Sequence, residues 1–375
     1  MLKGVHLTLM IGPAVAVPVS PSVLEGLTDV QVTSSTEGRS GFQLSFNLHT
    51  HSPLHTLFLL SGGSIFPIVR VIIIATVNGT PDVLMDGVVT RHEISPGSDT
   101  GHATLTVTGE DLSLLMNYID FSGFPYPALP AEAQVALILA KYAVLGIVPM
   151  VIPSPLVDIA LPIERIPRQQ GKDLEHIKKL ADDVGYVFYV DPGPAPGMNV
   201  AYWGPDLKLG TPQRALNVDM DAHTNIESIG FSFDGDSKKM PIVYIQNPMA
   251  KVPIPIPIPD ITPFSPPLGL VPPIPKGIEP ITETAKYSPI RGLLIGMALA
   301  AKSSQAVSAT GTLDVSRYGR VLKARKLVGV RGAGTAFDGL YYVKSVTHKI
   351  KRGEYKQDFT LSRNGLISTV SKVPA

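Results

Sequence analysis

Alternating apolar and polar side chains mark the first hundred residues as strand-forming. From Phe42 to Leu48 every second residue is large and apolar, and from Ala103 to Thr108 apolar residues alternate with threonine. Val69–Val77 is almost continuously β-branched, as in a strand covered on both faces. Short strands separated by Gly and Pro turns predict a small antiparallel β-barrel or sandwich over residues 1–108.

The period changes after Gly109, where apolar residues recur at helical spacing. The apolar positions of three predicted helices are Leu112, Leu115, Met116 and Ile119; Val135, Ile138, Leu139 and Tyr142; and Leu174, Ile177, Ala181 and Val184. Asp173 and Glu175 suit the positive N-terminus of the third helix, which leads into a predicted strand at Tyr186–Val190. Residues 109–222 are therefore predicted to form a mixed α/β insertion domain.

Strand patterns return at Ile226–Phe233 and Ile242–Ile245, before a stretch that is rich in proline. Met249–Thr282 contains eleven prolines, and Val252–Pro259 has the sequence VPIPIPIP. Because proline lacks an N–H and fixes φ, this segment cannot be a central strand or the interior of a helix. We expect an extended, polyproline-like arm of roughly 25 Å, at about 3.1 Å per residue.

Two interpretations of this arm remain open at this point: a flexible surface loop, or an arm that docks on another subunit. Its richness in Ile, Val, Leu and Pro favours docking, because flexible linkers are usually polar or charged. A helix is predicted next, at Ser288–Ser303. Residues 249–305 would then interrupt a second β-barrel domain, 223–368, which is followed by a short tail, 369–375.

The end of that second domain, Phe337–Gly365, predicts two strands joined by a charged turn at Lys351–Glu354. In the second strand Tyr355, Phe359 and Leu361 share one face, and the intervening residues are mostly polar. This alternation is typical of a half-buried antiparallel strand. The fold class predicted from the whole chain is a mixed, β-rich α+β protein.

The composition narrows the classes of function. Of the 375 residues, 44% are hydrophobic and only 17% are charged, which predicts extensive surface hidden in subunit contacts. A net charge of +1 without a Lys/Arg block argues against nucleic acid as the main ligand. The absence of cysteine excludes disulfides and thiol catalysis. The prolines in the apolar N-terminus favour a first strand over a signal peptide, and Gly292–Ala301 is too short to cross a bilayer.

Candidate metal ligands occur in three short clusters. His49, His51 and His55 include an i, i+2 pair, but no carboxylate close by in the sequence completes a ligand set. The other two clusters are Asp219, Asp221 and His223, and the pair Asp234 and Asp236. Neither has the sequence context of a nucleotide-sugar or calcium site, so both are predicted to be turns. We therefore expect no metal site and no cofactor.

Catalytic motifs are similarly weak. Gly329–Gly334 has GxxGxG spacing, but a strand rather than a helix is predicted to follow, so it is interpreted as a β-turn. Asn78-Gly79-Thr80 matches a glycosylation acceptor without a secretion signal to support its use. No G-x-S-x-G or H-E-x-x-H motif is present. The expectation is a non-enzymatic protein with no catalytic residue and no small-molecule substrate.

Two other functions remain as alternatives. A tail-associated peptidoglycan hydrolase needs a carboxylate cleft, and the available acids are Glu110, Asp111, Asp120, Glu132 and Asp158. A β-rich carbohydrate-binding adhesin usually displays clustered aromatic side chains. Here Trp203 is the single tryptophan and aromatic residues make up 7% of the chain.

Three stretches together resemble the baseplate hub proteins of contractile tails: the late control gene D family of phages, the central hub of T-even phages and the N-terminal part of VgrG spike proteins. These stretches are Gly171–Val190, Ser288–Leu313 and the closing hairpin. In the hairpin the residues that match the family pattern are Gly339, Tyr341, Tyr342, Val343, Val346, His348, Leu361 and Arg363. These are structural rather than catalytic signatures.

The resemblance implies two similar β-barrel domains in each chain and a homotrimer. Six similar domains in a ring would imitate sixfold symmetry, so the ring could join a hexameric tail tube to a trimeric spike. VgrG proteins continue into further spike domains, whereas twelve residues follow Arg363 here, so a separate spike chain is expected. The proline-rich arm has no counterpart in the family pattern.

The prediction from the sequence is thus a structural baseplate hub subunit of a phage tail or a phage-tail-like contractile injection system. Its expected partners are two further copies of itself, tube or tube-initiator proteins, the spike and other baseplate proteins. Assembly is expected in the bacterial cytoplasm, without a transmembrane segment.

Overall fold

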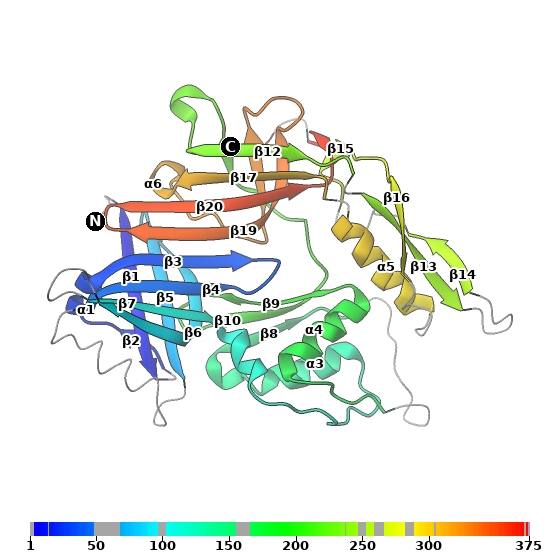
Figure 1. Ribbon diagram of the computed structural model, residues 1–375, viewed down its shortest axis with the longest axis horizontal. Helices are drawn as coiled ribbons and strands as arrows, with labels where there is room; N and C mark the ends of the chain where they lie inside the picture. The colour runs from blue at the N-terminus through cyan, green and yellow to red at the C-terminus, as the bar shows by residue number, and fades with distance from the viewer. Residues whose placement is uncertain are drawn as a thin grey trace.

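The structure is a computed structural model, and it describes most of the chain. The described residues are 4–13, 15–48, 68–96, 103–154, 166–236, 238–246, 253–258, 266–281, 289–303, 305–370 and 373. Three layers of structure are visible in Figure 1: a large sheet, a smaller α/β part beside it, and a small sheet with one helix at one end of the molecule. No helix in the described ranges is long and apolar enough to span a membrane.

One antiparallel sheet of 13 strands dominates the fold (Figure 1). Along the main path of hydrogen-bonded neighbours the strands are β12 (Ser228–Phe233), β17 (Val307–Asp314), β20 (Glu354–Arg363), β19 (Gly339–Lys351), β3 (Leu27–Ser35), β4 (Gly41–Leu48), β7 (Ala103–Asp111), β6 (Thr80–Pro96), β5 (Val69–Val77), β1 (Val5–Pro13) and β2 (Val17–Pro18). Off this path, β18 (Leu327–Arg331) pairs with β19, and β11 (Gln213–Asn217) pairs in parallel with β18.

The prediction of a β-rich α+β fold is confirmed, but the prediction of two closed barrels is wrong. β3 from the first β-region pairs with β19 from the last, from Ser35 opposite Ser345 to Asp29 opposite Lys351. The two edges therefore satisfy each other's backbone groups, instead of each region closing on itself. The apolar side chains of both regions also form a single core cluster, which extends in sequence from Leu9 to Leu361.

The closing hairpin has the predicted form. Lys351 pairs with Glu354 across a two-residue turn, in which Gly353 has a φ of +81° that favours glycine. Tyr355, Phe359 and Leu361 are buried in the main core, as the alternation predicts. The hairpin does not seal a second barrel, because β19 continues the sheet into β3.

Helices and a three-stranded sheet form the α/β part. Its sheet has the order β8 (Ile147–Val151), β10 (Asn199–Gly204) and β9 (Val187–Pro192), and α3 (Ala131–Ala140) and α4 (Asp173–Val184) lie on one face. The first predicted helix is the 3₁₀ helix η1 (Leu112–Asn117). The apolar residues of α3 and α4 enclose a second core around Trp203, which is completely buried. The remaining short helices are α1 (Pro21–Gly26), η2 (Ala143–Leu145), η3 (Asp221–His223) and α6 (Val315–Tyr318).

The described parts of the proline-rich region, residues 253–258 and 266–281, contain paired strands, which corrects the expected polyproline arm. β14 (Pro253–Pro257) pairs with β13 (Lys239–Gln246), and β16 (Gly277–Ile281) pairs in parallel on the other side of β13. Just after β14, the Ile258 N–H donates to the Pro241 carbonyl at 3.0 Å. Backbone N–H groups alternate in direction along a strand. The isoleucines of β14 therefore direct their N–H groups at β13, and the prolines, which have no N–H, come at the positions whose backbone nitrogen faces the outer edge. β14 is an edge strand, where proline is tolerated, although the central strand β13 also contains a proline, Pro241.

Helix α5 (Pro289–Ser303), close to the predicted range, covers one face of this small sheet. The contact is tight at Gly296, where an added Cβ would lie 2.5 Å from Cγ2 of Val243 and 2.7 Å from Cγ1 of Ile258. Val243, Ile258 and Ala300 form the buried centre of this third core. A glycine at this position therefore lets helix and sheet approach closely.

A second connection holds the region to the large sheet. β15 (Gly269–Val271) pairs with β21 (Leu366–Ser368) just after the closing hairpin. The Asn364 side-chain oxygen accepts hydrogen bonds from the Leu268 and Gly269 N–H groups at 2.8 and 3.0 Å. The proline-rich region is thus anchored on its own chain.

Candidate functional site

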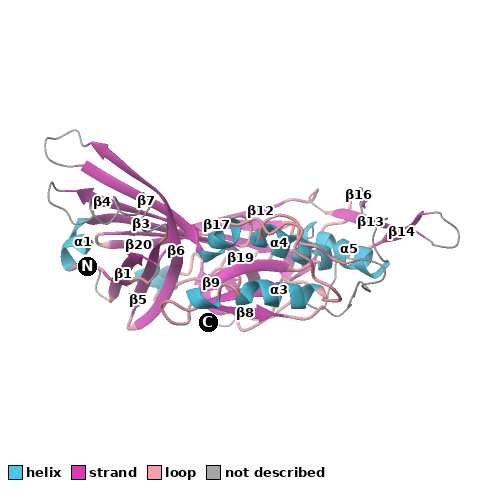
Figure 2. Cartoon of the chain, turned by 90° about the horizontal axis from the view of Figure 1, so that it is seen from below, coloured by secondary structure: helices cyan, strands magenta, loops and turns pink. Residues whose placement is uncertain are grey.

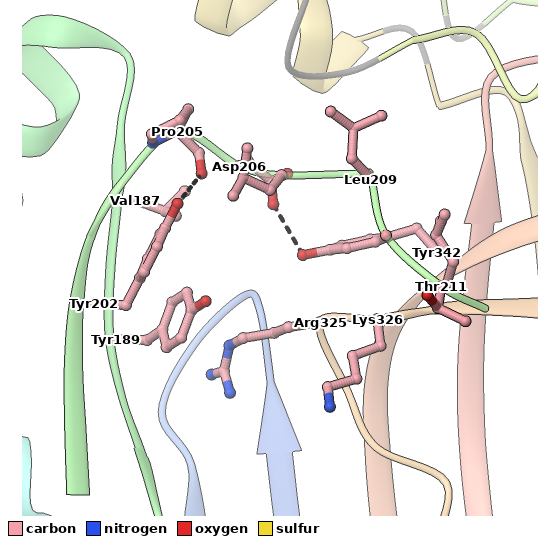
Figure 3. A pocket seen from close by; sticks show the side chains of 13 residues that line it. Val187, Tyr189, Tyr202, Pro205, Asp206, Leu209, Thr211, Arg325, Lys326 and Tyr342 are labelled. Carbon is pink, nitrogen blue, oxygen red and sulfur yellow. Dashed lines mark hydrogen bonds between the residues drawn. The ribbon is translucent and has the colours of Figure 1, made fainter. Parts of the chain in front are cut away.

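A pocket of about 330 Å³ lies where the α/β part meets the large sheet (Figure 3). β9 contributes Val187 and Tyr189, β10 contributes Tyr202, and β19 contributes Tyr342. β18 contributes Leu327, and the connecting segments complete the wall with Pro205, Asp206, Leu207, Leu209, Gly210, Thr211, Arg325 and Lys326. The pocket is therefore built from parts of the chain that are distant in sequence.

Three tyrosines give the pocket its polar lining. The Tyr342 hydroxyl donates to the Asp206 carboxylate at 2.9 Å, and the Tyr202 hydroxyl donates to the Pro205 carbonyl at 2.7 Å (Figure 3). The rings of Tyr189 and Tyr202 stack with centroids 5.0 Å apart. Burial raises the pKa of Tyr202 to about 12. The pKa of Tyr342 is also raised, mainly by burial and in addition by the nearby Asp206 carboxylate. These hydroxyls stay protonated near neutral pH and act as hydrogen-bond donors.

Arg325 joins three segments at the edge of this pocket. Its guanidinium contacts the Asp191 carboxylate at 2.5 Å and donates to the Ser35 carbonyl at 2.5 Å. The same group lies 4.2 Å from the centre of the Tyr189 ring. The backbone N–H of Arg325 donates to the Val343 carbonyl at 2.9 Å, with a φ of +61° that few non-glycine residues adopt.

The polar groups of this pocket are the tyrosine hydroxyls, the Asp206 carboxylate, the Thr211 hydroxyl and the side chains of Arg325 and Lys326. Its described lining has neither a histidine nor a serine. The positive charge of Arg325 is already directed at Asp191 and Tyr189. The pocket is best described as a joint that fixes the α/β part against the large sheet.

A buried ion pair forms a second joint of the same kind. Arg70 on β5 donates two hydrogen bonds to Asp86 on β6, both at 2.7 Å, and the Asn199 side chain donates to Asp86 at 2.8 Å. Arg70 also donates to the Leu145 carbonyl at 2.9 Å. The three side chains are almost fully buried, and hydrogen bonds from Arg70 and from the Asn199 amide nitrogen compensate the Asp86 carboxylate across the junction, whereas the Asn199 Oδ1 has no partner among the described residues.

Two of the three candidate metal clusters lie among the described residues. His49, His51 and His55 lie outside the described residues. Asp219 and Asp221 have positive φ angles in the turn around η3, and Asp221 and His223 line a pocket of about 510 Å³. Arg214 and Arg317 line the same pocket, so its positive charges oppose cation binding. Within the described ranges no three His, Cys, Asp or Glu side chains are placed to hold a metal ion.

The other singled-out residues also have structural roles. Asp234 accepts a hydrogen bond from the Asp236 N–H at 2.9 Å within a turn, and Asp236 forms an ion pair with Lys276. Gly329–Gly334 runs from β18 into a turn and then into β19, as interpreted from the sequence. Asn78 occupies the hairpin turn between β5 and β6, and its amide donates to the Gly319 carbonyl at 3.0 Å.

The carboxylates considered for a hydrolase serve separate local contacts. Glu110 pairs with Arg39 at 3.0 Å, and Asp111 accepts from the Ser113 N–H at the start of η1 at 2.8 Å. Asp120 accepts from the Ser122 N–H at 2.7 Å, and Glu132 lies in the first turn of α3. Asp158 lies outside the described residues. Each of these four described carboxylates is therefore accounted for by a local contact or by its place at the start of a helix.

The sequence did not predict the contacts of Arg325 or those of Arg70. Arg325 and its partners are 134 and 290 residues apart, and Arg70 and Asn199 approach Asp86 from distant elements. No short motif marks such pairs. One signal for the second of these contacts was present in the sequence: Arg70 and Asp86 each stand among apolar residues of a predicted strand. A charged residue in such a position is buried only when it is paired, so each of them implied a partner of opposite charge.

No protein-family model and no curated protein matches this chain. Solved structures do match its fold. A tail protein from Neisseria meningitidis MC58 superposes with a TM-score of 0.64 at 14% identity, covering 97% of this chain and 98% of that one. The 43 kDa tail protein of prophage MuSo2 from Shewanella oneidensis gives a TM-score of 0.63 at 14% identity, covering 96% and 98%.

A third match is an E. coli component of the type VI secretion system, described as similar to the T4 bacteriophage tail proteins gp27 and gp5. It gives a TM-score of 0.51 at 12% identity and covers 93% of this chain and 76% of that one. The chain therefore has the fold of phage tail and type VI secretion proteins. At these identities the similarity concerns the fold alone.

Proposed function

We propose that this protein is a structural baseplate hub subunit of a phage tail or a contractile injection system, and that it is not an enzyme. The observation that carries this proposal is the extent of the fold similarity, which covers nearly the whole of this chain and the whole of two tail proteins. The contacts of Arg325 and Arg70 support it, because they connect the α/β part to the large sheet.

The proposed assembly is a homotrimer that forms a pseudo-sixfold ring. Each chain supplies two β-regions, one from each side of the β3–β19 pairing, so three chains supply six. Such a ring would match the hexameric tail tube at one end and a separate trimeric spike at the other. Assembly in the bacterial cytoplasm with other baseplate proteins belongs to the same proposal.

The edges of the large sheet offer a physical route to this ring. β12 is one end of the main strand path, and β2 covers β1 only at Met10 and Ile11 at the other end (Figure 1). β12 has the sequence SIGFSF, without the charges or prolines that usually protect an edge strand. Pairing of free edges between copies would satisfy these backbone groups and bury the apolar surface of a chain with little charge.

Light scattering combined with size-exclusion chromatography tests the proposal. We expect a particle of about 120 kDa at micromolar concentration, three times the 40.0 kDa of one chain, and interfaces of roughly 2,000–5,000 Å². Ser232→Lys places a charge on the β12 edge and is expected to weaken the trimer. Ser308→Lys is a matched control, because Ser308 is the exposed partner of Ser232 one strand further in. A stable wild-type monomer would contradict the proposal.

A further inference from the structure

The pocket beside η3, whose positive charges oppose cation binding, contains two arginines without an acidic partner. Arg214 lies on β11 and Arg317 on α6, and both line this pocket of about 510 Å³. Among the described residues neither guanidinium forms an ion pair, although the Asp221 carboxylate lines the same pocket. We name it the η3 pocket. A guanidinium without a carboxylate partner presents its N–H groups to an incoming anion.

The Arg214 side chain is held in place by the element opposite. Its Nη1 donates to the Tyr318 carbonyl at 2.8 Å, and the Tyr318 hydroxyl donates back to the Arg214 carbonyl. Gly319 has a φ of +80°, and a Cβ there would lie 3.0 Å from Nη1 of Arg214, so the glycine leaves room for the guanidinium. A binding group that is fixed in advance loses little conformational entropy when its ligand arrives.

The loop that forms the other wall of the η3 pocket is also fixed. Asn225 is 4% exposed; its Oδ1 accepts from the Asn217 N–H at 2.8 Å, and its Nδ2 donates to the Ala215 carbonyl at 2.9 Å. The Asn217 side chain donates to the His223 carbonyl at 3.0 Å. Asp221 has a φ of +49°, which few non-glycine residues adopt and which persists where surrounding contacts determine the conformation.

The charge of the pocket selects the class of ligand. Its two arginines and Asp221 leave one net positive charge, not counting His223. A carboxylate brings this charge to zero, whereas a phosphate dianion would leave a negative excess beside Asp221. The planar guanidinium fork also matches the two oxygens of a carboxylate. The ligand that fits the η3 pocket is therefore a carboxylate.

The lining favours a side chain of another protein over a small molecule. Ala222 is the only apolar residue among the described residues that line the pocket, and Arg214, Asp221, His223 and Arg317 are exposed. Small molecules usually bind where apolar side chains enclose most of their surface. Exposed charges at the rim of a protein interface instead orient a partner.

The η3 pocket lies at the end of β12, which is one edge of the large sheet. The segment after η3 leads into β12 at Ser228, and α6 begins where β17 ends, at Asp314. Ser228 pairs with Thr312 of β17, and the two strands lie side by side in both views (Figures 1 and 2). Both walls of the pocket therefore adjoin the edge along which a partner strand would pair.

We propose that the η3 pocket binds the carboxylate of an Asp or Glu side chain of a protein that covers the β12 edge. Arg214 and Arg317 hold the carboxylate, and pairing along β12 brings the partner into position. Because the contact is exposed, it contributes register and specificity more than affinity. The inference rests on the proposed edge pairing for the place of the partner, but carboxylate binding is measured on the protein alone.

A titration with a small glutamate compound provides the test. N-acetyl-glutamate N-methylamide carries the expected carboxylate, and the glutamine analogue is a neutral compound of nearly the same size. Ligand-observed NMR at constant ionic strength should detect the glutamate compound with a dissociation constant on the order of 10 mM, as expected of one exposed ionic contact. The glutamine compound should show no measurable binding.

Arg317→Gln and a matched control locate the binding. Arg317→Gln should weaken binding of the glutamate compound by about fivefold, the upper end of the range for an exposed ion pair. Arg320→Gln makes the same charge change at an exposed residue outside the pocket and should leave binding unchanged. Equal effects of the two substitutions, or equal binding of both compounds, would overturn the inference. Tighter binding of inorganic phosphate would overturn the assignment to a carboxylate. Circular dichroism checks the fold of each variant.

Titrations above and below the concentration at which the protein dissociates separate this inference from the proposed ring. Binding to the dissociated chain alone supports the inference, with a neighbouring copy as the source of the carboxylate. Binding in both states supports it with a different protein as the source. A wild-type monomer that binds the glutamate compound rejects the ring and leaves the carboxylate site standing. Absence of binding in every state overturns the inference, whether or not the trimer forms.

Discussion

Acidification is expected to destabilise the large sheet through His348, and the His348→Asn substitution tests this. His348 lies on β19 and is 4% exposed within the main core. The Tyr355 hydroxyl and the Gln357 side-chain amide nitrogen lie 2.8 and 3.2 Å from its Nδ1. Burial, with a smaller contribution from Lys323, lowers the pKa of His348 from 6.5 to about 3. The folded protein therefore holds this imidazole neutral.

The direction and size of the effect follow from proton linkage. The unfolded chain takes up a proton near pH 6.5, whereas the folded chain does so only near pH 3, so stability is lost as the pH falls between these values. Within this window, each pH unit of acidification lowers the free energy of unfolding by about 1.4 kcal/mol. Between about pH 7.5 and about pH 5, His348 should lower the free energy of unfolding by about 2 kcal/mol.

Urea unfolding followed by far-UV circular dichroism measures this loss at both pH values. Asparagine places an oxygen near the position of Nδ1 and does not titrate, so His348→Asn should be less stable at neutral pH but should lose about 2 kcal/mol less on acidification. The difference between the two proteins removes the contribution of the other titrating groups. Equal losses in both proteins would refute a neutral buried His348.

Three further substitutions test other contacts. Asp86→Ala leaves the Arg70 guanidinium buried without its carboxylate, so the free energy of unfolding should fall by about 3–5 kcal/mol in urea titrations. Asn364→Ala removes the acceptor of two N–H groups and should speed hydrogen exchange at Leu268 and Gly269, at a local cost of about 1–3 kcal/mol. Pro255→Thr restores an N–H on the outer edge of β14 and should increase self-association, measured by light scattering over time.

Each of these substitutions has its own control. Asp82→Ala on β6 breaks a more exposed ion pair with Lys323 and should cost no more than about 1 kcal/mol. In the Asn364→Ala protein, amides of the β17–β20 ladder should exchange as before; global acceleration would contradict a local anchor. Ile254→Thr keeps an N–H that already points at β13, so an equal rise in association would contradict the role given to Pro255.

Local patterns were sufficient for elements whose neighbours are close in sequence. The hairpin at Lys351–Glu354 formed as predicted, because the strand alternation and the glycine turn are both local properties. Helix α4 also formed where its apolar spacing placed it, with Gly185 in a left-handed conformation after its last turn. By contrast, nothing near Arg325 indicated Ser35 or Asp191 as partners.

In the proline-rich segment, too, the local sequence determined one property and a contact with a distant strand decided another. Its sequence determined that Val252–Pro259 could be neither a central strand nor a helix, since proline has no N–H to donate. Whether it extends into solvent or pairs at an edge depends on whether another strand offers acceptors on one side. β13 does so, and the core beneath α5 then takes in Ile256 of this strand and Ile258 just after it.

The sequence by itself determined the β-rich class and the positions of the main strands and helices, because these depend on side-chain period and on turn residues. Only the tertiary structure decided that β3 pairs with β19 and that both β-regions share one core. Two separately closed barrels and one continuous sheet would both bury the same apolar faces of these strands. The choice between the two arrangements therefore depends on which distant strand edges pair. That information lies in long-range pairing and is absent from the local pattern.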